Sequence, residues 1–146
     1  MKWVTRERPK TDRIACPWLI RRFVDPEAEI LYVPADRVLE VAAEEGARSF
    51  DAPGAEFTHR DGLCSFEVLM EEFSLGRSND PALERLARIV HAADVAEARD
   101  SDPLGPGLEA IGVGGLDVEA DDHRLLERGQ FVYDALYAWC RRHADG

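Results

Sequence analysis

The second half of the chain constrains the fold most, because helical patterns follow one another there without strand-like segments between them. The longest pattern starts near Asp121 and repeats apolar or small residues every three or four positions, as one face of a helix requires. These residues are Leu125, Gly129, Val132, Tyr133, Leu136 and Cys140. Three shorter helices are expected before it, one after Ser65, one from Pro81 and a glycine-rich one from Pro103.

The first half instead alternates strand-like and helical segments. Short stretches rich in β-branched and aromatic residues predict strands at KWVT near the start and at 29–33, 48–52 and 56–60. Pro53-Gly54 indicates a turn, so the last two strands should form a hairpin, and 36–46 should be a helix that ends at Gly46. The expected fold class is α+β, with a small three- to four-stranded sheet and flanking helices in the first half and a mostly helical second half. We expect one domain over residues 1–146.

Charge is unevenly distributed along the sequence. The formal net charge is −11, which argues against nonspecific binding of nucleic acid, since that requires a basic surface. Residues 1–22 nevertheless carry seven basic side chains against two acidic ones, a local balance of +5 that leaves −16 for the rest. A small anion should therefore approach the protein near this opening segment.

The cysteines and the chain start bear on the cellular compartment. Cys16, Cys64 and Cys140 are odd in number and widely spaced, which fits neither a disulfide framework nor a four-thiolate zinc site. We expect reduced thiols. A strand-like KWVT opens the chain, and neither a signal segment nor a membrane-length apolar run is evident, so we expect a cytoplasmic protein with no membrane partner.

The stretch ACPWLIRRF at 15–23 allows two interpretations of Cys16. With Pro17 as the first helical residue, Cys16 would cap the helix, and free N–H groups with nearby Arg13 would stabilise a thiolate. A helix that starts earlier, at Thr11 or Asp12, would instead make Cys16 a small buried residue. The first alternative makes Cys16 a candidate nucleophile or metal ligand.

The two arginines of the same stretch also have two interpretations. Cys16 and Arg22 match the C-x5-R spacing of phosphatase loops that cradle an oxyanion, although Pro17 lacks one of the N–H groups such a loop needs. Arg21 and Arg22 either bind an anion, together with Arg13, or form salt bridges with nearby carboxylates.

Several segments in order resemble one known family. They are TDRIACPWLIRRFVDPEAEILYVP, FDAPGAEFTHRDGLCSFEVLM, DPALERLARIVHAAD and ADDHRLLERGQFVYDALYAWCR. They are similar to the chromate-resistance domain that forms the C-terminal part of ChrB-type proteins. The resemblance implies a role in the stress response to chromate, a toxic oxyanion. ChrB-type regulators carry a further N-terminal region associated with transcription, so we expect that this chain does not itself bind DNA. Other proteins join the domain to a rhodanese-like domain, which implies metal, sulfur or redox chemistry.

Histidines, a cysteine and carboxylates supply candidate metal ligands. His59 ends a predicted strand and Cys64 follows a turn, so both can converge on one ion, with oxygen from Asp51 or Glu56. On the last helix, His123 and Glu127 are spaced i,i+4, with Asp122 beside them. The predicted metal ligands are His59, Cys64, Asp122, His123 and Glu127, and the predicted ion is Zn, Mn or Fe.

Two further features belong to this hypothesis. His91 and Asp94 form a third candidate pair at i,i+3, and Asp134 could orient a ligand histidine from outside the site. Each set also has an ordinary explanation, since acidic residues and histidines on helices are commonly solvated and an Asp-Asp pair suits a helix start.

Three functional hypotheses follow. In the first, a metal held by His59, His123 and a carboxylate polarises a small oxyanion, with Arg21 or Arg22 supplying positive charge. In the second, the chain is a non-enzymatic sensor or interaction module that acts through a protein partner or as a homodimer. In the third, Cys16 is a reactive thiol resolved by Cys64.

Overall fold

Three short parallel strands form the sheet, in the order β2-β1-β3. The computed structural model describes residues 1–144, apart from the side chain of Arg77. Strand β1 (Lys2–Arg6) lies in the centre and pairs along its length with β2 (Glu29–Val33), whereas β3 (Arg48–Ser49) is only two residues long. Parallel pairing requires crossover connections. The first contains α1 (Asp12–Leu19) and the π-helical η1 (Ile20–Val24), and the second contains η2 (Ala35–Arg37) and α2 (Val38–Glu45).

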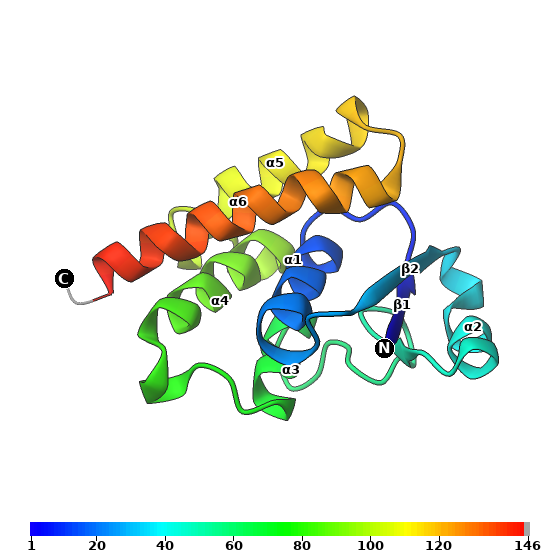
Figure 1. Cartoon of the computed structure of the whole chain (residues 1–146). Coiled ribbons are helices and arrows are strands. Elements are labelled where there is room, and N and C mark those ends of the chain that lie inside the picture. The colour runs from blue at the N-terminus through cyan, green and yellow to red at the C-terminus, as the bar shows by residue number, and fades with distance from the viewer. Residues whose placement is uncertain (145–146) are drawn as a thin grey trace.

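The second half is helical and covers α1 on the side away from the sheet, as Figure 1 shows. Its elements are α3 (Ser65–Glu72), η3 (Arg77–Asn79), α4 (Pro81–Asp94), η4 (Ala96–Ser101), α5 (Gly105–Val118) and α6 (Asp122–His143). The predicted α+β fold class is therefore confirmed. Asp80 and Asp121 cap α4 and α6, accepting hydrogen bonds from Leu83 N and Arg124 N, as the helix-start signals indicated.

The predicted hairpin between 48–52 and 56–60 is wrong. Pairing stops after Ser49, and Phe50 forms a single parallel bridge with Phe57. The physical reason is that Asp51 has a left-handed backbone, with φ +46°, which turns the chain out of the strand. Phe50 and Phe57 are both buried in the core. Residues 51–64 form an ordered loop instead of a fourth strand, and this loop carries His59.

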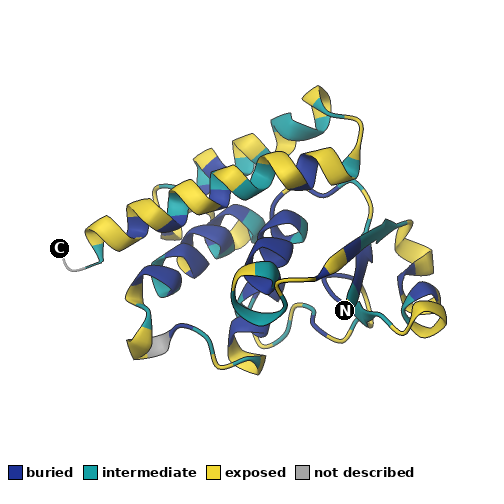
Figure 2. Ribbon diagram, in the orientation of Figure 1, coloured by how far each residue is buried: buried dark blue, intermediate teal, exposed yellow. Residues whose placement is uncertain are grey.

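Helix α1 is the central element, and Figure 2 shows its buried colour between the sheet and the outer helices. Every residue of α1 except Arg13 is buried. Pro17 lies inside the helix and cannot donate to the carbonyl of Arg13, and this oxygen accepts a hydrogen bond of 2.7 Å from the Tyr32 hydroxyl instead. Helix α6 crosses α1 closely, since a Cβ on Gly129 would lie 2.4 Å from Ile14 Cγ2. The start of α1 is thus held between β2 and α6.

Candidate metal and anion site

Three aspartates converge on one imidazole at the start of α1. Nε2 of His59 lies 3.1 Å from Asp94 Oδ2, 3.5 Å from Asp12 Oδ2 and 3.5 Å from Asp51 Oδ1. Asp12 is the first residue of α1, Asp94 the last of α4, and Asp51 the residue that turns the chain after β3. We call these four residues the carboxylate pocket. Three elements from distant parts of the sequence therefore meet at one point.

Ser65, at the start of α3, fixes two of these carboxylates. Its backbone N–H donates to Asp12 Oδ2 at 2.9 Å, and its hydroxyl donates to Asp51 Oδ1 at 2.8 Å. The N–H of Phe66 also donates to Asp12 Oδ1, at 3.2 Å. Asp12 thereby accepts hydrogen bonds from N–H groups that no carbonyl within α3 can reach. The start of α3 therefore fixes the carboxylates of Asp12 and Asp51, and both also face His59.

The electrostatics of this pocket favour a cation. Burial raises the pKa of Asp12 to about 7, with His59 opposing the rise and the other two aspartates adding to it. Burial followed by the charge of Asp51 also raises the pKa of Asp94. The hydrogen bond to Asp12 raises the pKa of His59 to about 9, although half of its side chain is exposed. An imidazolium among carboxylates is thus the protein's own counter-charge at this point.

Three basic side chains, Arg6, Lys10 and Arg13, which we call the cationic wall, line the same cavity as the four residues of the carboxylate pocket, and its volume is about 240 Å³. Arg6 donates to the carbonyl oxygen of Asp51 at 2.8 Å, and Arg13 Nε lies 3.5 Å from Asp51 Oδ2. Lys10 also lines the cavity, and no hydrogen bond or ion pair ties it to another residue in the described part of the chain. The cavity therefore combines converging carboxylates with a cationic wall.

A second group of donor atoms lies next to this pocket. Cys64, Glu67 and His91 place one ligand atom each within 4.8 Å of one another. Glu67 Oε1 accepts from Cys64 N at 3.0 Å and lies 2.6 Å from His91 Nδ1. We call these residues the thiol cluster. It adjoins the carboxylate pocket because Cys64 precedes Ser65 and His91 lies one helical turn before Asp94.

The structure divides the predicted ligands differently from the sequence hypothesis. His59 and Cys64 fall into separate groups, and so do His91 and Asp94. Glu56, the other proposed oxygen donor, pairs with Arg48 at 2.7 Å. Asp12 and Glu67 were not singled out from the sequence, because each resembles an ordinary helix-start residue. Asp12 has the signal of a carboxylate in an otherwise largely apolar helix, whereas Glu67 has no such signal because α3 also contains Glu71 and Glu72.

The predicted ligands on α6 have other partners. Asp122 accepts from the N–H of Arg8 at 3.0 Å and from its guanidinium at 2.9 Å. His123 packs edge-on against Tyr32, with ring centroids 5.5 Å apart, and Glu127 lies 3.2 Å from Arg21. Neither donor group contains a residue of α6. Asp134 accepts from Trp18 Nε1 at 2.8 Å and orients no histidine.

The hypothesis of a helix-capping thiolate at Cys16 is wrong. Helix α1 starts at Asp12, so Cys16 lies in its interior, fully buried, and its thiol donates to Asp12 Oδ1 at 3.4 Å. Burial and the charge of Asp12 raise its pKa well above that of a free thiol. The C-x5-R stretch is helical and forms no loop around an anion. Since Cys64 is also buried, a redox role for this pair of thiols loses its basis.

Arg21 and Arg22 do not line the carboxylate pocket, whereas Arg13 does. Arg21 is paired with Glu127, as described above. The guanidinium of Arg22 lies 5.0 Å from the ring centroid of Tyr137 and 3.8 Å from Asp134. The alternative that these two arginines form salt bridges therefore fits, although the partners come from α6 and not from neighbouring residues.

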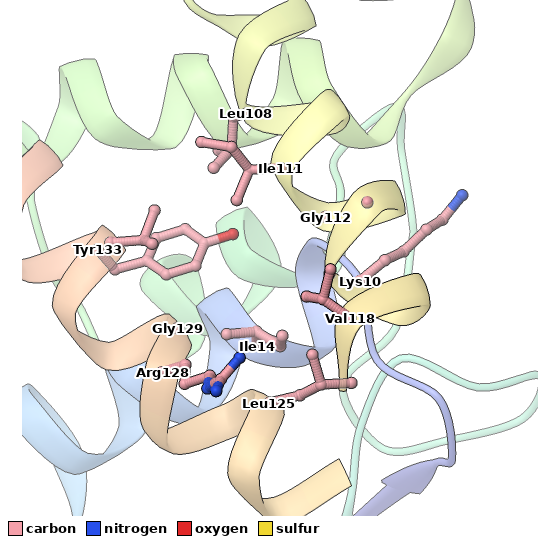
Figure 3. Close-up of a pocket in the computed structure, with 13 residues that line it drawn as sticks. Lys10, Ile14, Leu108, Ile111, Gly112, Val118, Leu125, Arg128, Gly129 and Tyr133 are labelled. Atoms are coloured by element: carbon pink, nitrogen blue, oxygen red, sulfur yellow. The ribbon is translucent and has the colours of Figure 1, made fainter. Parts of the chain in front are cut away.

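A separate apolar pocket of about 400 Å³ opens between α1, α5 and α6. Figure 3 shows Leu108 and Ile111 on one side of it and Leu125 on the other, with Tyr133 closing one end. Lys10 runs along its edge and also lines the carboxylate pocket. The two cavities are therefore neighbours. No helix in the described residues is both long and apolar enough to cross a membrane.

Comparison with known proteins assigns the family. The family model of the ChrB C-terminal domain matches residues 3–140. The chain belongs to the ChrB C-terminal domain family. A ChrB-family relative, Protein ChrB of Cupriavidus metallidurans, is 38% identical over 136 residues. This match covers 93% of the present chain but only 40% of the relative. No solved structure matches.

Proposed function

We propose that this ChrB-family domain is a chromate-resistance protein that binds a divalent metal ion in the carboxylate pocket and a small oxyanion beside it. The observation that carries the proposal is the convergence of three aspartate oxygens on His59 Nε2 within 3.5 Å. Such a cluster of carboxylates, two of them more than nine-tenths buried, favours bound cations. His59, Arg6 and Arg13 supply positive charge in the metal-free protein, and a divalent ion would take the place of the His59 proton.

The donor set favours particular metals. Carboxylate oxygens with one imidazole nitrogen form a hard, oxygen-rich site, which suits Mn²⁺ or Fe²⁺ more than a thiolate-seeking ion. Asp12, Asp94 and His59 would supply the ligands. Asp51 would complete the oxygen shell, or remain the partner of Arg6 and Arg13.

The cationic wall is the basis for the oxyanion. Without a metal ion, the three carboxylates would weaken the attraction of the basic side chains for an anion at neutral pH. A bound divalent ion would offset two of the three carboxylate charges, so that Arg6, Lys10 and Arg13 would set the local charge and supply donors for the anion's oxygens. We therefore propose that oxyanion binding depends on the metal. Chromate is the anion that the family suggests.

Metal binding can be tested on chelator-treated protein by titration with Mn²⁺. His59→Gln and Asp94→Asn should each weaken binding at least about tenfold, since loss of even an outer partner of a metal costs 10–100-fold. His123→Gln is the matched control, because it removes a predicted ligand that lies against Tyr32, and it should bind like the wild type. Absence of Mn²⁺, Fe²⁺ and Zn²⁺ binding, or equal effects of all three variants, would refute the metal site.

Anion binding is tested separately with chromate, and with sulfate as a tetrahedral comparison. Metal-loaded protein should bind chromate more tightly than metal-free protein, and Lys10→Gln should weaken that binding without affecting the metal. Equal chromate binding with and without metal would show that the oxyanion does not depend on the carboxylate pocket.

A second candidate function is an interaction module that pairs with another copy of itself. It is favoured by apolar side chains exposed on α5 and α6, notably Phe131 at 75% and Val118 at 74%. Light scattering after gel filtration distinguishes the two. A dimer that Phe131→Glu dissociates, together with no metal or chromate binding, would favour the interaction module.

A further inference from the structure

We propose that Cys64, Glu67 and His91 form a second metal site, of the thiolate, carboxylate and imidazole type that zinc prefers. This inference goes beyond the proposed function and does not depend on it, because the two sites share no ligand. Their three donor atoms lie within 4.8 Å of one another. A tetrahedral zinc site with bonds of about 2.0–2.3 Å places ligand atoms about 3.3–3.8 Å apart, so only small side-chain movements are needed.

Two packed helices position these donors. Cys64 is the N-cap of α3 and Glu67 is the third residue of that helix, while His91 lies in the last turn of α4. The side chain of Cys64 accepts from the backbone of Glu67, and Glu67 accepts from the backbone of Cys64. Two of the three ligands are therefore fixed relative to each other by the backbone, which is what a preorganised site requires.

Capping alone does not account for this set of side chains. Serine, aspartate and asparagine are the preferred N-caps, and a thiol is a weak hydrogen-bonding group in comparison. Glu67 completes the capping box by binding the N–H of Cys64, yet the same oxygen also lies 2.6 Å from His91 Nδ1. The combination of a soft sulfur, an imidazole and a carboxylate is what distinguishes this cluster from an ordinary helix start.

The environment of the thiol is consistent with a cation that belongs there. Cys64 is buried, and a carboxylate oxygen of Glu67 lies within 4.8 Å of its sulfur. A bound zinc ion deprotonates a coordinating thiol outright and would offset the neighbouring negative charge. Glu67 and His91 each keep about a fifth of their side-chain surface exposed, so an ion can enter from solvent.

The number of ligands indicates the kind of zinc site. Structural zinc sites generally have four protein ligands, whereas catalytic ones have three and leave a position for water or a small ligand. Three ligands are present here among the described residues. We therefore expect an open coordination position. The thiolate also sets this site apart from the carboxylate pocket, where oxygen dominates.

Cobalt provides the test, because Co²⁺ replaces zinc and gives a near-ultraviolet charge-transfer band only when a thiolate binds it. The protein of 146 residues, reduced and free of oxygen, is titrated with Co²⁺ and then with Zn²⁺. The wild type should show the band, and about one equivalent of Zn²⁺ should remove it. No band at saturating Co²⁺ would overturn the proposal.

Variants assign the band to this cluster. Cys64→Ser should lose it, and the protein should stay folded because serine is a better N-cap than cysteine. His91→Gln should weaken Co²⁺ affinity at least about tenfold and keep the partner of Glu67. Cys140→Ser, the matched control, should leave the band unchanged. A band that survives Cys64→Ser would contradict the assignment.

The same titration separates this site from the proposed function. His59→Gln should leave the thiolate band intact, since His59 belongs to the carboxylate pocket. If the band is present while Mn²⁺ fails to bind, only the proposed function is lost. If Mn²⁺ binds and the band is absent, only the second site is lost.

Discussion

The last turn of α4 and the first turns of α6 carry similar side chains in different surroundings. His91 and Asp94 on α4 are spaced i,i+3, and His123 and Glu127 on α6 are spaced i,i+4. The pair on α4 reaches partly buried donor groups with carboxylates and a thiol. The pair on α6 meets an aromatic ring and an arginine. Spacing along one helix thus shows which side chains share a face, and the neighbouring elements decide whether that face can hold a ligand.

The largest effect on stability is expected from Asp12→Ala, in the carboxylate pocket that includes Asp94 of α4. The substitution leaves the N–H groups of Ser65 and Phe66 without their acceptor in a buried position. We expect the free energy of unfolding to fall by about 2–3 kcal/mol in a denaturant titration, because unsatisfied buried donors cost about 1–3 kcal/mol each. Asp12→Asn keeps one acceptor oxygen and should lose less. Equal stability of Asp12→Ala and the wild type would show that the carboxylate pocket is not held by α3.

A smaller loss of stability is expected from Arg8→Ala, which removes the partner of Asp122 at the start of α6. The guanidinium binds Asp122 and the carbonyl oxygens of Leu116, Glu119 and Ala120, which ties the opening segment to the α5–α6 connection. Because Arg8 is partly exposed, we expect a loss of only about 1 kcal/mol. Mn²⁺ affinity, measured in parallel, should not change. A change in Mn²⁺ affinity would mean that the start of α6 is coupled to the carboxylate pocket, against the distinction drawn between the α4 and α6 side chains.

The pH dependence of stability tests the cluster around His59 itself. A group whose pKa is raised on folding, here from 6.5 to about 9, stabilises the folded state below 6.5, and this contribution is lost as the pH rises through 9. Metal-free wild type should therefore be more stable than His59→Gln near pH 6.5, and the difference should vanish above pH 9. Thermal unfolding at several pH values measures it, and a constant difference across this window would contradict the raised pKa.

The smallest effect is expected from Glu127→Gln on α6. Two thirds of the side chain is exposed, and its ion-pair partner among the described residues is Arg21, at 3.2 Å. Exposed ion pairs contribute little, so the free energy of unfolding should change by less than about 0.5 kcal/mol. Metal affinity should be the same as in the wild type. A loss of metal binding would restore Glu127 as the ligand that the sequence suggested.

Local signals predicted most of the helices. Asp80 and Asp121 cap the helices that they were expected to start, and Gly46 ends α2 with a left-handed backbone, φ +63°. The hairpin failed because the left-handed conformation of Asp51 has no clear signature in the sequence. Strand propensity at 56–60 was outweighed by burial of Phe57 against the core.

The site was predictable only in its parts. His59, Cys64, His91 and Asp94 were all recognisable as candidate ligands, but their grouping depends on how α1, α3 and α4 meet. No local pattern shows that Ser65 lies under both Asp12 and Asp51. The carboxylate pocket was therefore missed as a unit, and the predicted ligands on α6 contact Arg8, Tyr32 and Arg21.

The proline in α1 has a consequence for how this site is kept in place. Because Pro17 leaves the Arg13 carbonyl free, the helix recruits Tyr32 from the edge strand as a replacement donor. This hydrogen bond ties β2 to Arg13, the residue next to Asp12. In Pro17→Ala the Arg13 carbonyl would gain an N–H donor within the helix, so this carbonyl would no longer depend on the Tyr32 hydroxyl for a hydrogen bond.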